Sequence, residues 1–180
     1  MLPRQCNACK CLVTAAVLLL MAAAVPASAA DDPCGAAPYR QFDFWVGEWE
    51  VSAPDGRRAG HNSITVEQGG CLLVERWQGV EGSTGMSMNF YQPLEQSWRQ
   101  VWVSPGVEID VTGGLADGSM VLEGTIVYLK DDRSRGFRGT WTPLEAGRVR
   151  QLFEEANEDG EWAPWFEGIY SPLEETAGAP

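Results

Sequence analysis

The order of apolar and polar positions beyond residue 47 is typical of short β-strands. Apolar residues, many of them β-branched or aromatic, alternate with polar ones over short runs, and Gly, Pro, Asp or Asn closes each run. The runs predict ten strands, at residues 48–53, 59–67, 71–78, 85–92, 97–104, 107–113, 119–129, 135–142, 147–156 and 161–170. No stretch within these limits keeps a 3.6-residue apolar period, so we expect helix only as a turn or so at residues 39–45.

The links between these strands predict how the strands are arranged. Pro54-Asp55-Gly56, Pro105-Gly106 and Glu158-Asp159-Gly160 are tight-turn sequences, and consecutive hairpins form a meander. A sheet of many strands removes its exposed edges when it closes on itself. We therefore predict an all-β fold, a single antiparallel up-and-down β-barrel of about ten strands with a short N-terminal helical plug. An immunoglobulin-like sandwich is the alternative, but the chain lacks the Cys-Trp-Cys arrangement of that fold.

The segment from Phe42 to Val51, FDFWVGEWEV, joins an apolar plug to the first predicted strand. Its four aromatic residues are too many for a surface loop. The segment resembles the opening of a family of small, mostly bacterial, exported proteins of unknown function that share a lipocalin-like or nitrobindin-like (calycin) barrel. The resemblance continues through Gly69-Gly70-Cys71 with Glu75 and Trp77, and through residues 85–91, 98–103, 117–122, 138–143 and 166–170. It implies the barrel fold and no particular reaction.

The start of the chain has the composition of a secretory signal peptide. Arg4 and Lys10 precede an apolar run over residues 12–25, and small residues follow up to Ala29. The run is shorter than the roughly 20 residues of a membrane-spanning helix. We therefore expect cleavage near Ala29, no membrane span, and a periplasmic or secreted protein. The predicted limits are residues 1–29 for the signal peptide, 30–170 for the lipocalin-like barrel domain and 171–180 for a flexible tail.

The net charge of the chain disfavours one class of partner. The charge is −12 at pH 7, and residues 1–29 hold two of the 13 basic side chains and none of the 25 acidic ones, so the cleaved chain would carry −14. Nucleic acid and anionic membrane surfaces are poor partners for such a protein.

Two of the five cysteines, Cys34 and Cys71, lie beyond the predicted signal peptide. In an oxidising compartment we expect them to form a disulfide that ties the N-terminal segment to a strand. Metal binding by these cysteines with His61 is the other possibility, but three scattered ligands form no recognisable motif, so we predict no metal site.

Strand alternation sorts the side chains into two faces, one of which lines the barrel. We predict that the Trp-bearing faces point inward, around a cavity for a flat, mostly apolar ligand with a polar end. The predicted ligand-binding residues are Glu75, Trp77, Asn89, Tyr91, Trp98, Gln100 and Trp102, with Arg138 and Gln151 as contributors from later strands.

Two other interpretations of the interior stay open. In one, the polar side chains hydrogen-bond one another inside a filled barrel. In the other, the register is inverted, and the interior is lined by Met86, Met88, Phe90, Val101 and Val103.

Few residues suggest catalysis or a cofactor. His61 is the single histidine, so Ser-His-Asp chemistry would depend on it alone. Glu75, beside Trp77, is the candidate general acid or base. Nitrobindin-like barrels hold haem through a histidine on a late strand, which this chain lacks; Tyr128 and Tyr170 are possible iron ligands, but we expect no haem and no other cofactor.

Three functions follow from these features. The first is an exported binding protein that holds a small hydrophobic or amphipathic molecule in the aromatic-lined cavity. The second is an enzyme that uses the same cavity for isomerisation, cyclisation or hydration, with Glu75 transferring protons, by analogy with other lipocalin-like barrels. The third is an envelope or partner-binding domain with a solid barrel. The shortage of catalytic residues favours binding over catalysis.

Overall fold

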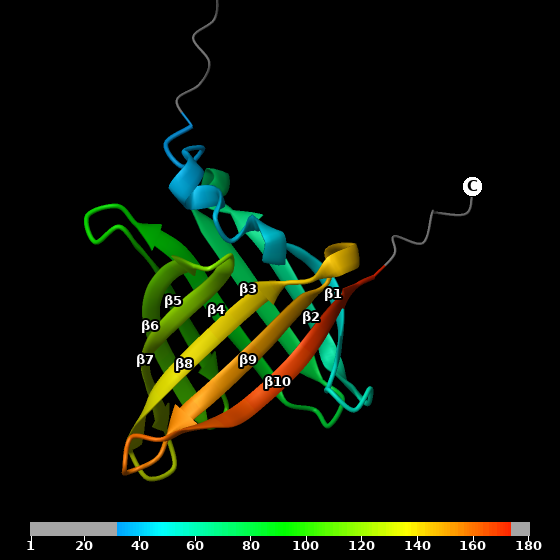
Figure 1. Cartoon of the computed structure of the whole chain (residues 1–180), viewed down its shortest axis with the longest axis vertical. Helices are drawn as coiled ribbons and strands as arrows, with labels where there is room; N and C mark the ends of the chain where they lie inside the picture. Colours follow the sequence, from blue (N-terminus) through cyan, green and yellow to red (C-terminus); the bar gives the residue numbers. More distant parts are fainter. Residues whose placement is uncertain (1–31, 174–180) are drawn as a thin grey trace, which may run out of the picture. The chain divides into compact units, whose positions relative to one another are not determined.

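A computed structural model describes residues 32–173, and in it the chain forms a closed antiparallel barrel (Figure 1). The strands are β1 (Gly47–Ser52), β2 (Arg58–Glu67), β3 (Leu72–Gly79), β4 (Thr84–Gln92), β5 (Ser97–Ser104), β6 (Val107–Ala116), β7 (Ser119–Tyr128), β8 (Arg133–Pro143), β9 (Val149–Ala156) and β10 (Trp162–Pro172). Each strand pairs with the next along the chain, and β1 pairs with β10 to close the barrel. The predicted up-and-down barrel is confirmed, and the sandwich alternative is wrong.

The strand limits agree closely with the predicted ones. β6 is longer than expected and ends at Ala116, and β10 continues to Pro172, so residues 171 and 172 belong to a strand and not to a tail. The predicted signal peptide, its cleavage site and residues 174–180 lie outside the described residues. Within residues 32–173, no helix has both the length and the apolar character that crossing a membrane requires.

The Trp-bearing faces of the strands point into the barrel. Trp98 and Gln100 on β5 are buried, at 2% and 1% exposure. On the opposite face, Met86 and Met88 of β4 and Val103 of β5 are 46%, 50% and 54% exposed. The inverted register is therefore wrong, and the outer face carries these apolar side chains.

The N-terminal segment covers one end of the barrel. It contains two short 3-10 helices, η1 (Ala37–Arg40) and η2 (Asp43–Trp45), drawn in blue in Figure 1. Phe42 stacks on Trp45 with ring centroids 5.0 Å apart and meets Trp141 of β8 edge-on at 5.2 Å. All three side chains are fully buried, as large aromatic groups in a core should be. This segment is the expected plug.

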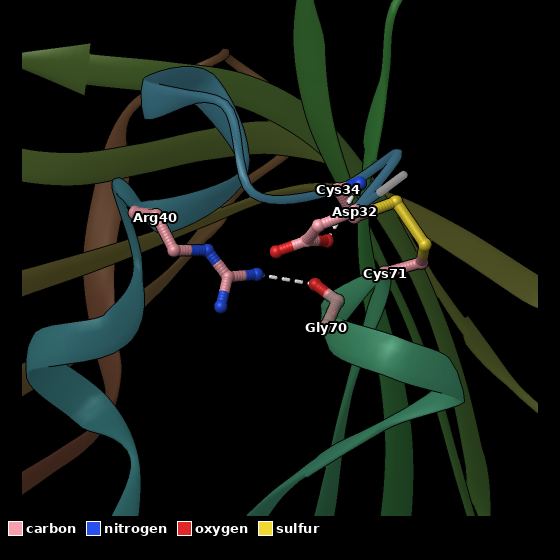
Figure 2. Close-up of a disulfide and its surroundings, with 5 residues drawn as sticks. All are labelled: Asp32, Cys34, Arg40, Gly70 and Cys71. Atoms are coloured by element: carbon pink, nitrogen blue, oxygen red, sulfur yellow. Dashed lines mark hydrogen bonds between the residues drawn. A yellow bond between two sulfur atoms is a disulfide. The ribbon is translucent and has the colours of Figure 1, made fainter. Parts of the chain in front are cut away.

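A disulfide joins the plug segment to the start of β3 (Figure 2). Cys34 and Cys71 are bonded, with their Cα atoms 5.1 Å apart. Nearby, the backbone nitrogen of Cys34 donates a hydrogen bond to the Asp32 carboxylate at 3.2 Å, and the Arg40 guanidinium donates one to the Gly70 carbonyl oxygen. The predicted pairing is confirmed, and a disulfide fits an extracellular or periplasmic location.

Replacing both Cys34 and Cys71 with alanine should lower the free energy of unfolding by roughly 3 to 4 kcal/mol, because the bond closes a long loop in the unfolded chain. The two residues are 37 positions apart in the sequence. Urea unfolding followed by tryptophan fluorescence measures the loss. An unfolding free energy equal to that of the oxidised wild-type protein would contradict it.

Candidate functional site

A cavity of about 380 Å³ opens at the end of the barrel opposite the plug. Its mouth lies between the β1–β2 turn and the β3–β4 turn, where Arg57, Arg58 and Glu81 line it. The wall contains five aromatic side chains, Trp77, Trp102, Phe153, Trp165 and Phe166. Its deepest residues are the buried Glu75, Gln151 and Tyr170. The interior is therefore hollow on the side away from the N-terminal segment.

Glycines on the strands make room for the indole rings of the wall. A Cβ atom on Gly85 of β4 would lie 1.9 Å from the Trp102 ring, and one on Gly60 of β2 would lie 2.6 Å from the Trp77 ring. The Trp77 ring also meets Phe166 edge-on at 6.0 Å, and its Nε1 donates a hydrogen bond to Ser83 Oγ at 3.3 Å. These contacts hold the rings against the strands, so the space beside them stays free.

A continuous row of hydrogen-bonded polar side chains crosses the interior. It involves β9, β10, β2, β3, β4 and β5, and its members are Gln151, Tyr170, Asn62, Glu75, Ser87, Asn89 and Gln100. Each of these side chains is at most 3% exposed. The inward positions of β6, β7 and β8 are apolar in contrast, among them Ile109, Leu122 and Phe137. The barrel thus has a polar half and an apolar half.

The Glu75 carboxyl is the acidic group of this row. Its Oε1 accepts a hydrogen bond from Asn62 Nδ2 at 2.7 Å, and its Oε2 accepts one from Ser87 Oγ at 2.6 Å. Burial raises the pKa of Glu75 from 4.5 to about 7, because desolvation outweighs the two hydrogen bonds, which favour the ionised form. The carboxyl therefore takes up and releases its proton nearer to neutral pH than an exposed carboxyl does.

Tyr170 and Gln151 extend the row beside Glu75. The Tyr170 hydroxyl accepts a hydrogen bond from Asn62 Nδ2 at 3.1 Å and donates one to the Gln151 amide oxygen. Burial and the neighbouring Glu75 charge raise the pKa of Tyr170 well above its usual value. The phenol therefore stays protonated, and the NH₂ group of Gln151 is the part of that amide left for a ligand.

The structure brings four of the predicted residues to the cavity surface, namely Glu75, Trp77, Trp102 and Gln151. Asn89, Gln100 and Trp98 are buried inside the barrel but do not line the cavity. Tyr91 packs edge-on against Tyr39 of η1 at 5.1 Å and lies at the plugged end. Asn89 and Gln100 therefore contact the site only through the polar row, and Trp98 and Tyr91 belong to the plugged end.

Two candidate residues lie on the outer face of the barrel. Arg138 was expected as a contributor to the lumen, but its neighbours Phe137 and Gly139 take the inward positions of β8. Its guanidinium pairs with Glu154 at 2.9 Å and lies 4.4 Å from the Trp162 ring. His61 pairs with Glu48 at 3.1 Å. Neither residue lines the cavity, so chemistry that depends on His61 has no support there.

Several residues of the site are not among those predicted from the sequence. Asn62, Phe153 and Phe166 occupy inward positions that the same alternation rule would have found on the second, ninth and tenth strands. Trp165 lines the cavity because the β9–β10 register shifts between Pro164 and Phe166. Such a bulge breaks the period of two, so alternation alone does not reveal this side chain.

The residues considered as ligands of a metal ion or of haem iron have other partners in the structure. Cys34 and Cys71 are consumed by the disulfide, which removes the ligand set with His61. In the described part of the chain, no three His, Cys, Asp or Glu side chains cluster in a way that could hold a metal ion. The hydroxyls of Tyr128 and Tyr170 donate hydrogen bonds to Glu155 and Gln151.

A comparison with models of known protein families and with curated proteins finds no match to this chain. The resemblance to small exported proteins with a lipocalin-like barrel therefore stays a prediction.

The wild-type protein should lose stability relative to a Glu75→Gln variant as the pH rises. The pKa of the carboxyl is 4.5 in the unfolded chain and about 7 in the folded one, so the folded state keeps a proton that the unfolded state releases between these values. The contribution of Glu75 to the free energy of unfolding is constant below pH 4.5 and falls as the pH rises to about 7. Above that pH it stays about 3 kcal/mol lower.

Urea unfolding of both proteins at pH values between about 4 and 8 measures this difference. A stability difference that does not change with pH would mean that Glu75 titrates as an ordinary exposed carboxyl.

Proposed function

We propose that the chain is an exported binding protein that holds a small, largely apolar molecule in the barrel cavity. The observation that carries this proposal is the 380 Å³ hollow with aromatic walls and a polar inner end. Its volume is within the range of small-molecule pockets, roughly 300 to 1,000 Å³. A molecule that leaves water for the faces of Trp77, Trp102 and Phe166 gains the free energy of apolar burial.

The polar inner end gives the ligand an orientation. Glu75, Gln151 and Tyr170 meet there, while the mouth is lined by charged side chains that water can reach. A ligand with one polar end would place that end against Glu75 and its apolar body between the aromatic rings. The open mouth gives access to such a ligand, which a solid barrel would not.

Export is part of this proposal. The sequence of the first 29 residues and the disulfide between Cys34 and Cys71 both favour a periplasmic or secreted protein. Membership of the lipocalin-like family of exported proteins is proposed on the residues of the FDFWVGEWEV segment and on the barrel.

Truncating Trp102 to alanine should weaken binding of the neutral aromatic dye N-phenyl-1-naphthylamine by about tenfold or more, because an apolar wall worth about 1.5 kcal/mol or more is lost. Titration of the dye fluorescence measures the affinity. Trp162→Ala is the matched control, since that indole contacts Arg138 on the outer face and leaves the cavity intact. Equal affinity in all three proteins, or no binding of the dye and of a panel of lipids, fatty acids and aromatic acids, would contradict the proposed function.

A second candidate function is proton-transfer catalysis by Glu75. The specific observation in its favour is a carboxyl with a pKa of about 7 on the surface of a cavity, which can accept and release protons at neutral pH. An isomerisation, cyclisation or hydration that uses this group should lose at least about a hundredfold in kcat in the Glu75→Gln variant. An activity that survives this substitution would exclude Glu75 as its acid or base.

A further inference from the structure

We propose that the polar end of the ligand is an organic ammonium group, held between the Glu75 carboxylate and the aromatic walls of the cavity. This inference rests on the proposed binding function and names the chemical class of the ligand. It depends on the direction of the hydrogen bonds around Glu75, on the acceptor positions that remain, and on the rings beside it.

The hydrogen bonds of the polar row converge on Glu75. Gln100 Nε2 donates to Asn89 Oδ1 at 2.7 Å, and Asn89 Nδ2 donates to Ser87 Oγ at 2.8 Å. Because Ser87 accepts from an amide nitrogen, its own proton points to Glu75 Oε2. Asn62 Nδ2 donates to Oε1 from the other side. Every bond in this part of the row is thus oriented to support a negative charge on Glu75.

The same row has acceptors to spare. An ionised carboxylate can accept about four hydrogen bonds, and Glu75 receives one at each oxygen. Glu75 lines the cavity, so a ligand that donates hydrogen bonds can reach it. A ligand carboxylate placed against the ionised Glu75 would meet repulsion, and the Gln151 NH₂ group beside it can donate to a neutral acceptor of the ligand.

No cationic side chain of residues 32–173 is paired with Glu75. The charged residues that share the cavity lie at its mouth, where Arg57 pairs with Asp55 at 2.7 Å and Arg58 pairs with Glu50 at 3.3 Å. Glu81 lines the same mouth.

On β10, Tyr170 is the titratable group that faces Glu75, and its phenol is neutral. The carboxylate therefore lacks a counter-charge that a bound cation would supply.

The rings of the wall favour a cation over a neutral donor. The faces of Trp77, Trp102 and Phe166 carry negative π-electron density, and desolvated aromatic sites bind ammonium groups through cation–π attraction. The net charge of the chain, −12, adds a field that draws cations toward the protein. An aromatic wall with one buried carboxylate is the chemistry that recognises an amine or a quaternary ammonium.

Paired titrations of phenyltrimethylammonium and its neutral isostere tert-butylbenzene test this inference. The first keeps its charge at every pH, so any pH dependence of its binding comes from the protein. Each compound is titrated into the protein expressed from the full chain, with displacement of N-phenyl-1-naphthylamine as the readout. At pH 8 we expect the cation to bind about tenfold more tightly than the isostere, and at pH 5.5 this preference should disappear as Glu75 takes up a proton.

Two variants locate the charge that is responsible. Glu75→Gln should remove the preference for the cation, so that the ratio of the two affinities at pH 8 falls to about one. Glu108→Gln removes an exposed carboxylate from the outer face of β6, away from the cavity, and should keep the preference. If Glu75→Gln does not fold, the pH dependence of the wild-type protein with the two compounds carries the test.

The outcomes separate this inference from the function on which it rests. Equal affinity for the two compounds at pH 8, or a preference for the cation that survives Glu75→Gln, would overturn the ammonium assignment and leave the binding function standing. Absence of binding by both compounds and by the dye would overturn both.

Discussion

The buried Glu75 carboxyl and the donors that surround it determine how the interior of this barrel is organised. An ionisable group at 3% exposure is costly to bury, and the protein offsets that cost with hydrogen bonds from Asn62 and Ser87. Those two residues need partners of their own, which the amides of Asn89 and Gln100 and the hydroxyl of Tyr170 provide. One carboxyl thus explains why six of the ten strands carry polar side chains at inward positions.

The N-terminal plug at one end and the glycine-bearing strands at the other account for the position of the cavity. At one end of the barrel, Phe42 and Trp45 enter from the N-terminal segment and complete an aromatic core with Trp141. No segment of the described chain enters from the other end, where the rings of Trp77 and Trp102 lie against glycine-bearing strands. The disulfide ties the plug segment to the start of β3 and so keeps the plug in that end of the barrel. The remaining cavity ends at the polar row on its inner side and opens to water at its mouth.

Much of this architecture could be predicted from the sequence because it depends on local rules. Alternation and turn residues located all ten strands, and the crowding of aromatics at residues 42–49 predicted the plug. The same period of two grouped Glu75 with Trp77, and Trp102 with Gln100, on one face of each strand, but it left open which face points inward.

The wrong predictions of site residues concern properties that the two-residue alternation of a strand does not determine. Arg138 was expected to contribute to the lumen from a later strand, whereas the buried Phe137 and Trp141 take the inward positions of β8. The depth of each inward residue depends on strand tilt and on the plug, so Asn89, Trp98 and Gln100 could not be separated from the cavity surface in advance. The bulge that turns Trp165 toward the cavity needs the pairing of β9 with β10, which is not a local property.

The state of the Glu75 carboxyl is the property on which this account depends most. The ¹³C chemical shift of its side-chain carbonyl, followed by NMR as the pH is varied, reports the titration of this one group directly. We expect a midpoint near the folded pKa of about 7, well above the ordinary value of 4.5. A midpoint close to 4.5 would contradict this, because either water would reach the carboxyl freely or the hydrogen bonds from Asn62 and Ser87 would offset the whole cost of its burial.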